Sequence, residues 1–485
     1  MELLIILLIP LVAAVLSLIH TKKGKFAAAM TIIAAFSVFI LSLHIAIYPH
    51  SGMAQNTPGI KGWLSCNPLS ALILLLISFV GLTASIFSFG YIGDAAKKVG
   101  SGGVRRYYAR YNLFLLSMLA VPMLSQLAMV WIAVELTTLF SVFLVSFEET
   151  AESLEAAWKY VILTCMGAAF ALIGILILYR GLTIAGGSAF TWSELIAVSP
   201  NIPPLFLAVA FLFILIGFGT KAGLVPLHTW LPDAHSQAPS PVCALLSGVE
   251  TTTALYVIIR LLPVIKVIPN DYASMWLMIF GLVSVGTAAF LLLQVTDYKR
   301  LFAFSTIEHM GIILVAAGLG GQAAHLGVVY QIMAHAFTKS FCFFAAGAVL
   351  LLSGTRDISS VKGMIRTSPL AGVCLLIGGL AIAGAPPFAV FLSEFSIISA
   401  GLAGGHYLVI ALLALFIVIA FCGIMYRVNK MVFGRPSGCC PQGLSLPFTC
   451  RLTLLLAIVP VILFGLYIPG HLHNLLRLAA LSLGR

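Results

Sequence analysis

Long apolar runs recur from one end of this chain to the other, and they constrain its fold more than any other feature. Each run has about 18 residues or more, which is enough to cross the roughly 30 Å hydrocarbon core of a bilayer as a helix. Only 8% of the residues are charged, against about 25% in ordinary soluble domains. The pattern predicts an all-α polytopic membrane protein with about 14 transmembrane helices. The expected spans are 2–19, 26–48, 67–91, 111–127, 129–147, 158–179, 204–227, 240–262, 272–294, 301–319, 324–353, 370–399, 406–427 and 452–470.

The cations of the chain are distributed unevenly between the two sides that these spans define. Placing the N-terminus outside puts most of the 26 lysines and arginines into inner connections such as 92–110 and 428–451. This bias follows the positive-inside rule, so the net charge of +11 reflects membrane topology and not a nucleic-acid partner. We expect a multi-pass protein of a bacterial or archaeal cytoplasmic membrane, surrounded by lipid, with both termini on the outer side.

Two of the spans are interrupted by glycine and proline at membrane depth. One lies within 204–235 and reads "GFGTKAGLVPLHTWLP"; the other lies within 370–399 and reads "IAGAPPFAVFLSEF". Proline removes a backbone donor, and the freed carbonyls are tolerated in a membrane only where protein or water surrounds them. Paired broken helices are typical of transporters built from inverted repeats, with an ion site near the midplane.

The broken spans are the seventh and the twelfth in order, which favours two inverted five-helix repeats, helices 4–8 and helices 9–13. Four parts follow from this count. They are residues 1–110 with helices 1–3, 111–265 with the first repeat, 266–428 with the second repeat, and 429–485 with an inner loop and C-terminal helix 14.

Each broken span carries one charged side chain, Lys221 in the first and Glu394 in the second. A charge near the bilayer centre costs about 3 kcal/mol or more, so such charges are usually paired and functional. Glu135, in "MVWIAVELTTLFSVF", is the expected partner of Lys221, and two coupled groups of this kind form a protonation switch. A structural ion pair, or for Glu394 a role in satisfying the helix break, is the alternative.

A polar stripe crosses the otherwise apolar span 324–353. Gln331, His335 and Lys339 are spaced at i, i+4 and i+8, so they share one helix face. This stripe is expected to line a hydrated path, with imidazole groups able to relay protons near neutral pH. The preceding span carries a polar face of its own, formed by Ser305, Glu308 and His309. The two faces are predicted to meet, although a purely structural hydrogen bond is the alternative for His309.

Other polar residues around the first break leave alternatives open. His228 and His235 can begin a proton route from the cytoplasm or serve the local structure, and Glu250 can act in transport or in helix packing. Asp233 can cap the turn before the next span. Asp297, Lys299 and Arg300 are expected to be loop residues that anchor the membrane interface.

We expect no catalytic residue and no metal site on this chain. Three cysteines, Cys439, Cys440 and Cys450, share one inner loop, but none forms a CxxC pair. They are interpreted as ordinary thiols.

Several stretches together resemble the antiporter-like proton-channel subunits of respiratory complex I and of the multisubunit cation/proton antiporters. They are "VELTTLFSVFLV", "EAAWKYVILTCMG", "GFGTKAGLVPLHTWLPDAHSQAPSPVCALLSG", "DYKRLFAFSTIEHMGII", "MAHAFTKSFCFF" and "GAPPFAVFLSEFSI". Within this family, "EAAWKY", "STIEHMG" and "APPFAVFLSEF" look most like the hydrogenase-4 F-type subunit of group 4 membrane-bound nickel–iron hydrogenases and formate hydrogenlyase-like complexes.

The resemblance implies fourteen core helices and a proton path along the membrane midplane. It matches Glu135 to the fifth-helix glutamate of the family and Lys221 to the seventh-helix lysine. Lys339 matches an eleventh-helix lysine that some members carry, and Glu394 matches the twelfth-helix acid that others replace with lysine. Thr252 stands where members often carry lysine or histidine on the eighth helix, which is a departure from the pattern.

The expected function is that of an ion-translocating, non-catalytic subunit of a redox-driven oxidoreductase complex, with the proton as the expected ion. The resemblance implies partners of two kinds: antiporter-like and quinone-site-like membrane subunits, and peripheral hydrogenase and iron–sulfur subunits. Nickel–iron and iron–sulfur centres are then expected in those partners and no cofactor on this chain. The alternatives are a subunit of a sodium/proton antiporter without redox partners, and a structural anchor that has lost transport, which the Thr252 departure would favour.

Overall fold

The structure is a computed structural model that describes residues 1–19, 24–48, 62–435 and 445–484, without the side chains of residues 94–99. The regular secondary structure of these ranges is helical, apart from isolated β-bridges. Eleven of the described helical segments are long and apolar enough to cross a membrane, and three shorter apolar helices accompany them. The prediction of an all-α membrane protein is confirmed at this level.

In chain order the longer helices are α1 (Glu2–Ser17), α2 (Lys25–Ile47), α3 (Pro68–Met123), α4 (Leu127–Val145), α5 (Ala151–Ile184), α7 (Pro204–Ala222), α10 (Thr251–Arg260), α12 (Tyr272–Leu292), α13 (Tyr298–Leu319), α14 (Gly321–Ser353), α16 (Pro369–Ile382), α17 (Ala389–Ala403), α18 (Tyr407–Phe433), α19 (Phe448–Leu466) and α20 (Gly470–Gly484). Short elements between them are α6 (Trp192–Val198), α8 (Trp230–Gln237), α9 (Ser240–Leu245), α11 (Leu262–Ile265) and α15 (Met364–Thr367).

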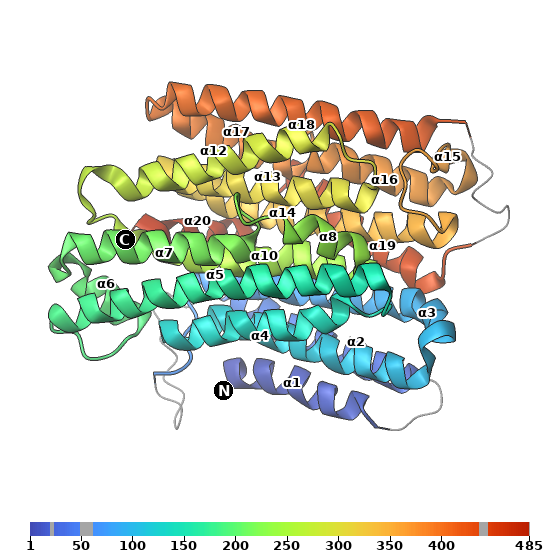
Figure 1. Cartoon of the computed structure of the whole chain (residues 1–485), viewed down its shortest axis with the longest axis horizontal. Coiled ribbons are helices and arrows are strands. Elements are labelled where there is room, and N and C mark those ends of the chain that lie inside the picture. The colour runs from blue at the N-terminus through green and yellow to red at the C-terminus, as the bar shows by residue number, and fades with distance from the viewer. Residues whose placement is uncertain (20–23, 49–61, 436–444, 485) are drawn as a thin grey trace.

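Most of the long helices run along a common direction, and the connections gather at two ends (Figure 1). One end carries α6 and the C-terminus, and the other carries α15; we call them the α6 end and the α15 end. The Nζ of Lys266, after α11, donates to the carbonyl of Gly484 at 3.2 Å, which fixes the end of α20 at the α6 end.

Polar side chains start several of these helices. Asn67 accepts a hydrogen bond from the backbone N–H of Ser70 at 2.7 Å, and Thr150 accepts one from Ser153 at 3.2 Å. These caps satisfy N–H groups that have no partner inside the helix. The positions of the helix starts therefore follow from local sequence.

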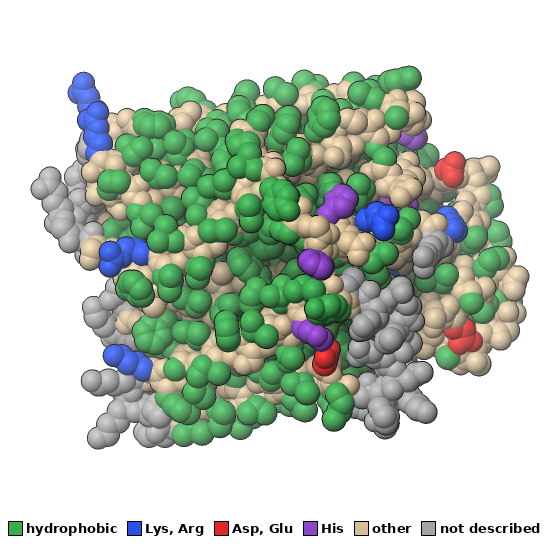
Figure 2. All heavy atoms as spheres, turned by 180° about the vertical axis from the view of Figure 1, so that it is seen from behind, with side chains coloured by type: hydrophobic (Ala, Val, Ile, Leu, Met, Phe, Trp, Pro, Cys, Tyr) green, Lys and Arg blue, Asp and Glu red, His purple; other side chains and the backbone are tan. Residues whose placement is uncertain are grey.

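Burial separates the interior helices from those that face the bilayer. The segment Ser240–Ile265 is buried along its whole apolar window, and α13 is buried over 94% of its window. In contrast, only 28% of the window of α18 is buried. The outer surface is mostly apolar, with few charged side chains on the face shown in Figure 2. The polar residues of the interior therefore lie inside a protein core that is itself surrounded by apolar helices.

The structure differs from the sequence prediction in three connections. Residues 92–110, expected to be a loop, are helical, and α3 continues through them with one non-helical residue, Gly100 (φ 73°). The short helix α6 lies in the connection 180–203, and the amphipathic helix α20 follows the last predicted span. Apolar run length alone does not detect such helices, because they carry too many polar residues to resemble spans.

Candidate functional site

The first broken helix is interrupted where the sequence predicts. The helix α7 ends at Ala222, Gly223 follows in the left-handed region (φ 83°), and α8 resumes only at Trp230. The freed backbone finds partners: the indole N–H of Trp230 donates to the carbonyl of Thr220 at 2.9 Å, and Ser284 accepts from the N–H of Val225 at 3.1 Å. The break is therefore stable at membrane depth, with Lys221 in the last turn before it.

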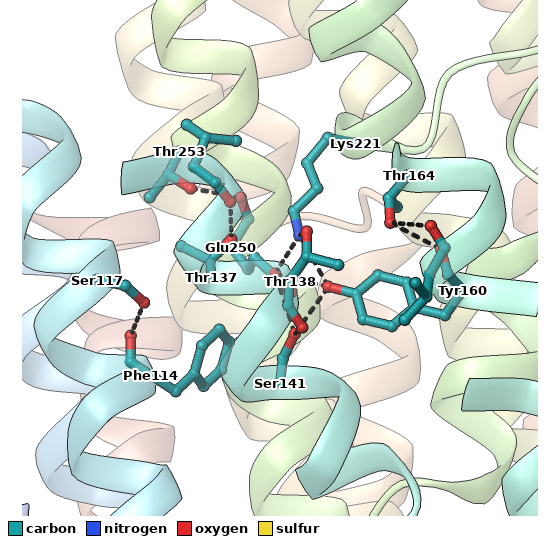
Figure 3. A network of polar contacts seen from close by, with 12 residues as sticks. Phe114, Ser117, Thr137, Thr138, Ser141, Tyr160, Thr164, Lys221, Glu250 and Thr253 are labelled. Carbon is teal, nitrogen blue, oxygen red and sulfur yellow. Dashed lines mark hydrogen bonds and ion pairs between the residues drawn. The ribbon is translucent and has the colours of Figure 1, made fainter. Parts of the chain in front are cut away.

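The side chain of Lys221 is buried at the centre of a polar cluster (Figure 3). Its Nζ lies 2.8 Å from Oε1 of Glu250 and donates to the hydroxyl of Tyr160 at 2.8 Å and to Oγ1 of Thr138. The Tyr160 hydroxyl in turn lies 2.9 Å from Oε1 of Glu250 and 2.8 Å from Oγ of Ser141. We call these five residues the Lys221 cluster.

The partner of Lys221 is Glu250, and the predicted pairing with Glu135 is wrong. Glu250 ends a π-helical segment, Leu246–Glu250, which lies between α9 and α10. A π turn inserts one residue into the helix and thereby changes which face the following side chains occupy. Glu135 is half-buried on α4, one turn before Thr138 of the Lys221 cluster. It is adjacent to the cluster without forming the ion pair.

The π-helical segment also connects the Lys221 cluster to the second group of polar residues. Ser247 lies 2.7 Å from Oγ1 of Thr306 on α13, and its carbonyl lies 3.0 Å from Nε2 of His335 on α14. Thr252 is buried, and its hydroxyl donates to the carbonyl of Gly248 at 3.2 Å within its own helix. The hydroxyl at the position of the family departure is therefore engaged locally.

The polar faces of α13 and α14 meet, as predicted. His309 lies 2.9 Å from the amide of Gln331, and the rings of His309 and His335 are 5.3 Å apart. The Nε2 of His309 lies 3.0 Å from the carbonyl of Ile382, the last residue of α16. Because Nε2 donates to a carbonyl, Nδ1 accepts from the Gln331 amide, and the ring is neutral in this arrangement. His309 thus satisfies a carbonyl that the second break leaves free.

Further buried charged residues lie on α17, α14 and α13. Glu394 on α17 is 6% exposed, and its carboxylate packs so closely against Gly384 (φ 76°) that a Cβ there would overlap it. Lys339 is fully buried and donates to the carbonyl of Phe302 at 2.6 Å and to the hydroxyl of Ser305. Glu308 is buried nearby on α13, and its Oε2 has no hydrogen-bond partner among the described residues.

Two histidines, His228 and His235, lie toward the α15 end, and their surroundings differ. His228 lies within the first break, half-buried, with Nδ1 3.2 Å from the carbonyl of Pro226. His235 is fully buried and stacks on Phe343 with ring centres 4.9 Å apart. Neither ring nitrogen of His235 has a hydrogen-bond partner among the described residues.

The expectation that Lys299 is an interface loop residue is wrong. It lies in the first turn of α13, 1% exposed, and its Nζ donates to the carbonyls of Ser236 and Ala238. Its neighbour Arg300 is half exposed and pairs with Asp233 at 2.8 Å. A signal for the burial of Lys299 exists in the sequence: it shares a helix face with Phe302 and Thr306, at i+3 and i+7.

No metal site is apparent in the part of the chain that the structure describes. Those residues hold no group of three or more histidine, cysteine, aspartate or glutamate side chains placed to bind a metal ion. Cys450 is buried in α19, whereas Cys439 and Cys440 lie outside the described residues.

Comparison with known proteins points to one family. The family model described as NADH:quinone oxidoreductase/Mrp antiporter, transmembrane, matches residues 125–420. A hydrogenase-4 component F homologue from Methylacidiphilum infernorum is 36% identical over 423 residues, which cover 86% of this chain and 87% of that protein. A subunit of the archaeal membrane-bound sulfane sulfur reductase superposes with a TM-score of 0.87 at 25% identity, covering 99% of this chain and 97% of that one.

A subunit of the Mrp complex from a Dietzia species has the same fold, with a TM-score of 0.86 at 19% identity over 99% of this chain and 97% of that one. Both the family model and the hydrogenase-4 relative cover the two broken helices and the Lys221 cluster. The chain belongs to the NADH:quinone oxidoreductase/Mrp antiporter transmembrane family.

Proposed function

We propose that this chain translocates protons as the membrane subunit of a redox-driven complex. The observation that carries the proposal is the buried Lys221–Glu250 ion pair at the break of α7, 2.8 Å between Nζ and Oε1. Buried ionisable groups in membrane proteins are costly and therefore usually serve transport. A pair that opens and closes changes the proton affinity of both groups, which gives a switch that a partner can drive.

The proposed path follows groups that lie next to one another. It begins at the Lys221 cluster, passes Ser247 and His335, and continues through His309 toward Glu394 at the second break. Lys339 and Glu308 flank the end of this path, near His309 and Glu394. Glu135 flanks its start at the Lys221 cluster. In this path, Glu250 is the relay group on the eighth span, a role that the family resemblance gives to a lysine or histidine at position 252.

The helix count and repeats belong to the same proposal. Counting α3 as two spans, and α16 with α17 as one, gives fourteen spans with breaks in the seventh and the twelfth. The two breaks each place a left-handed glycine next to a buried charge, Gly223 beside Lys221 and Gly384 beside Glu394. This correspondence supports two inverted five-helix units, at 111–265 and 266–428.

Orientation and partners follow from the charges and the relatives. We place the α15 end in the cytoplasm, since Lys299, Arg300 and Arg356 cluster there. The names of the relatives, a hydrogenase-4 component and a subunit of a respiratory membrane complex, support neighbouring membrane subunits and peripheral subunits that hold the nickel–iron and iron–sulfur centres.

Sodium/proton exchange is the second candidate function, and the Mrp relative supports it. Sodium is a hard cation that needs several oxygen ligands, as magnesium and calcium do. The proposed path does contain carboxylates, at Glu250 and Glu394, but amino and imidazole groups at Lys221, His309, His335 and Lys339 lie between and beside them. These groups exchange protons and do not bind hard cations, so the structure favours the proton.

Lys221→Ala tests the proposed function directly. Purified complex in sealed vesicles should lose proton uptake driven by electron transfer, while the assembled complex keeps its subunits on a native gel. Lys159→Ala, on the exposed start of α5, is the matched control and should pump normally. Undiminished, sodium-independent pumping in the Lys221 variant would refute the proposal, and sodium-dependent flux would favour the antiporter.

A further inference from the structure

Arg260 is a buried cation that the path does not use. It ends α10 at the α6 end, is 7% exposed, and forms no ion pair within the described residues. Its guanidinium carbon lies 4.5 Å from the centre of the Trp192 ring and 5.6 Å from that of the Tyr256 ring. A guanidinium group stays protonated in proteins, so this site keeps an uncompensated positive charge.

The residues around Arg260 close the α6 end of the first five-helix unit, residues 111–265. We call this unit the first half and residues 266–428 the second half. Arg260 donates to the hydroxyl of Tyr256, which also lies 2.9 Å from Oγ of Ser70 at the start of α3. The indole N–H of Trp192 donates to the carbonyl of Leu124 at 3.2 Å, just after α3. The helices α6 and α10 and both ends of α3 therefore meet around one cation.

Arg260 lies on the same helix as the carboxylate of the Lys221 cluster. Glu250 directly precedes α10 and Arg260 ends it, so they are ten positions apart, about 15 Å along the helix axis. The Lys221 cluster has Arg260 toward the α6 end, and the helix break with half-buried His228 toward the α15 end. Its surroundings are therefore asymmetric.

At the α6 end, the described residues of the second half include no buried lysine or arginine. A cavity of about 470 Å³ lies there between α11, α12, α13, α14 and α20, and Asp271, Gln322, His325 and the exposed Lys266 are among the residues that line it. Polar and acidic groups attract a hydrated proton, whereas a fixed cation in a region of low dielectric repels it. The two halves therefore differ at this end: the cation of the first half, Arg260, is buried, whereas Lys266 in the second half is exposed and shares the cavity with Asp271.

We propose that Arg260 is a cationic seal that prevents protons from passing between the Lys221 cluster and the α6 end. The cluster then exchanges protons only with the α15 end and with the second half, and release at the α6 end occurs through the second half. This inference rests on the proposed function, because a seal matters only where protons move. Arg260 acts here through its fixed positive charge, which repels protons, and it is not part of the path.

The test measures passive proton flux in the absence of electron donors. Complex in sealed vesicles, with the membrane potential clamped by potassium and valinomycin, is given a pH step and followed with an internal pH dye. Arg260→Met should raise the flux at least tenfold, whereas Arg260→Lys, which keeps the charge, should stay close to wild type. Arg180→Met, exposed on α5 near the same end, is the matched control and should not leak.

A second variant distinguishes a lost seal from a loosened protein. If protons leak through the Lys221 cluster, adding Lys221→Met to Arg260→Met should return the flux to the wild-type level. A passive proton flux in Arg260→Met that equals the wild-type flux, or a raised flux that persists in the double variant, would overturn the inference. Pumping driven by electron transfer in Lys221→Ala is a separate measurement, so failure of the proposed function is recognised independently of failure of the seal.

Discussion

The Nζ of Lys221 lies 2.8 Å from Oε1 of Glu250, and this ion pair joins the broken end of α7 to the π-helical segment before α10. Both side chains are buried, and Oε2 of Glu250 has no hydrogen-bond partner among the described residues. The pair therefore has one carboxylate oxygen that is free to accept a further hydrogen bond.

Glu250→Gln should destabilise the protein more than Glu135→Gln. Removing one member of a buried ion pair leaves the other uncompensated, which costs about 3 kcal/mol. Glu135 makes no ion pair with Lys221, so its amide variant should unfold within a degree or two of wild type. The measurement is the thermal unfolding midpoint of the detergent-solubilised complex. Equal midpoints for the two variants would contradict the assigned pairing.

Tyr160→Phe should slow proton translocation without preventing assembly. The hydroxyl bridges Lys221 and Glu250, whereas the ring lies 5.0 Å from Nζ and remains in the variant. Losing the bridge should cost about 1–2 kcal/mol and slow driven uptake roughly five- to thirtyfold. Tyr179→Phe, exposed on the same helix, is the control in the same vesicle assay. Full activity in Tyr160→Phe would mean that the hydroxyl is dispensable.

His309→Phe should destabilise the second break. The imidazole donates to the carbonyl of Ile382, and a phenyl ring leaves that buried carbonyl without its donor, at a cost of about 1–3 kcal/mol. The thermal midpoint should fall, and α16 should exchange backbone hydrogens faster. His471→Phe, at an exposed position on α20, should leave both unchanged. An unaltered exchange rate in α16 would show that another group satisfies the carbonyl.

The two helix breaks could be predicted from sequence because they depend on local backbone chemistry. Glycine at positive φ and proline without an N–H act wherever they occur, so residues 223–229 and 383–388 are interrupted as expected. The meeting of the α13 and α14 faces was predictable for a similar reason, because both stripes keep the helical period.

The partner of Lys221 could not be predicted in the same way. The direction of Glu250 depends on a π turn at Leu246–Glu250, and a single inserted residue leaves no periodic signal in the sequence. For Lys299, the helical register with Phe302 and Thr306 is visible in the sequence, but its partners depend on tertiary packing: its Nζ donates to the carbonyls of Ser236 and Ala238, more than sixty residues earlier. Arg260 likewise becomes a buried cation only when α6 packs over it.

Lys299→Met should lower the free energy of unfolding, although Lys299 resembles a loop cation in the sequence. Methionine fills the space but donates no hydrogen bonds, so two buried carbonyls lose a charged donor, at about 2 kcal/mol or more. Arg300→Met removes a half-exposed ion pair with Asp233 and should cost less than about 1 kcal/mol. Thermal midpoints of the two neighbours compare the cases directly. A larger loss in Arg300→Met would reverse the assignment of which cation is structural.

Glu194→Gln should loosen the segment that holds Trp192 over Arg260. The backbone N–H of Ser188, together with that of Ala189, donates to the Glu194 carboxylate and holds its pKa below the ordinary value. A carboxyl with a lowered folded pKa stabilises the fold fully above its unfolded pKa of about 4.3, and this contribution is lost as the pH falls through the lower folded value. At neutral pH the contribution is therefore complete in wild type and absent in the variant.

Hydrogen exchange at neutral pH should then be several times faster over 186–198 in Glu194→Gln, since the amide binds these N–H groups more weakly than the carboxylate does. Glu152→Gln, at the start of α5 and at the opposite end of the bundle, is the matched control and should leave the same peptides unchanged. Wild-type protein should lose the protection only in acid, below pH 4.3, and the variant should show no such transition. Equal protection in wild type and variant at neutral pH would mean that Trp192 is held over Arg260 by its contacts with α3 alone.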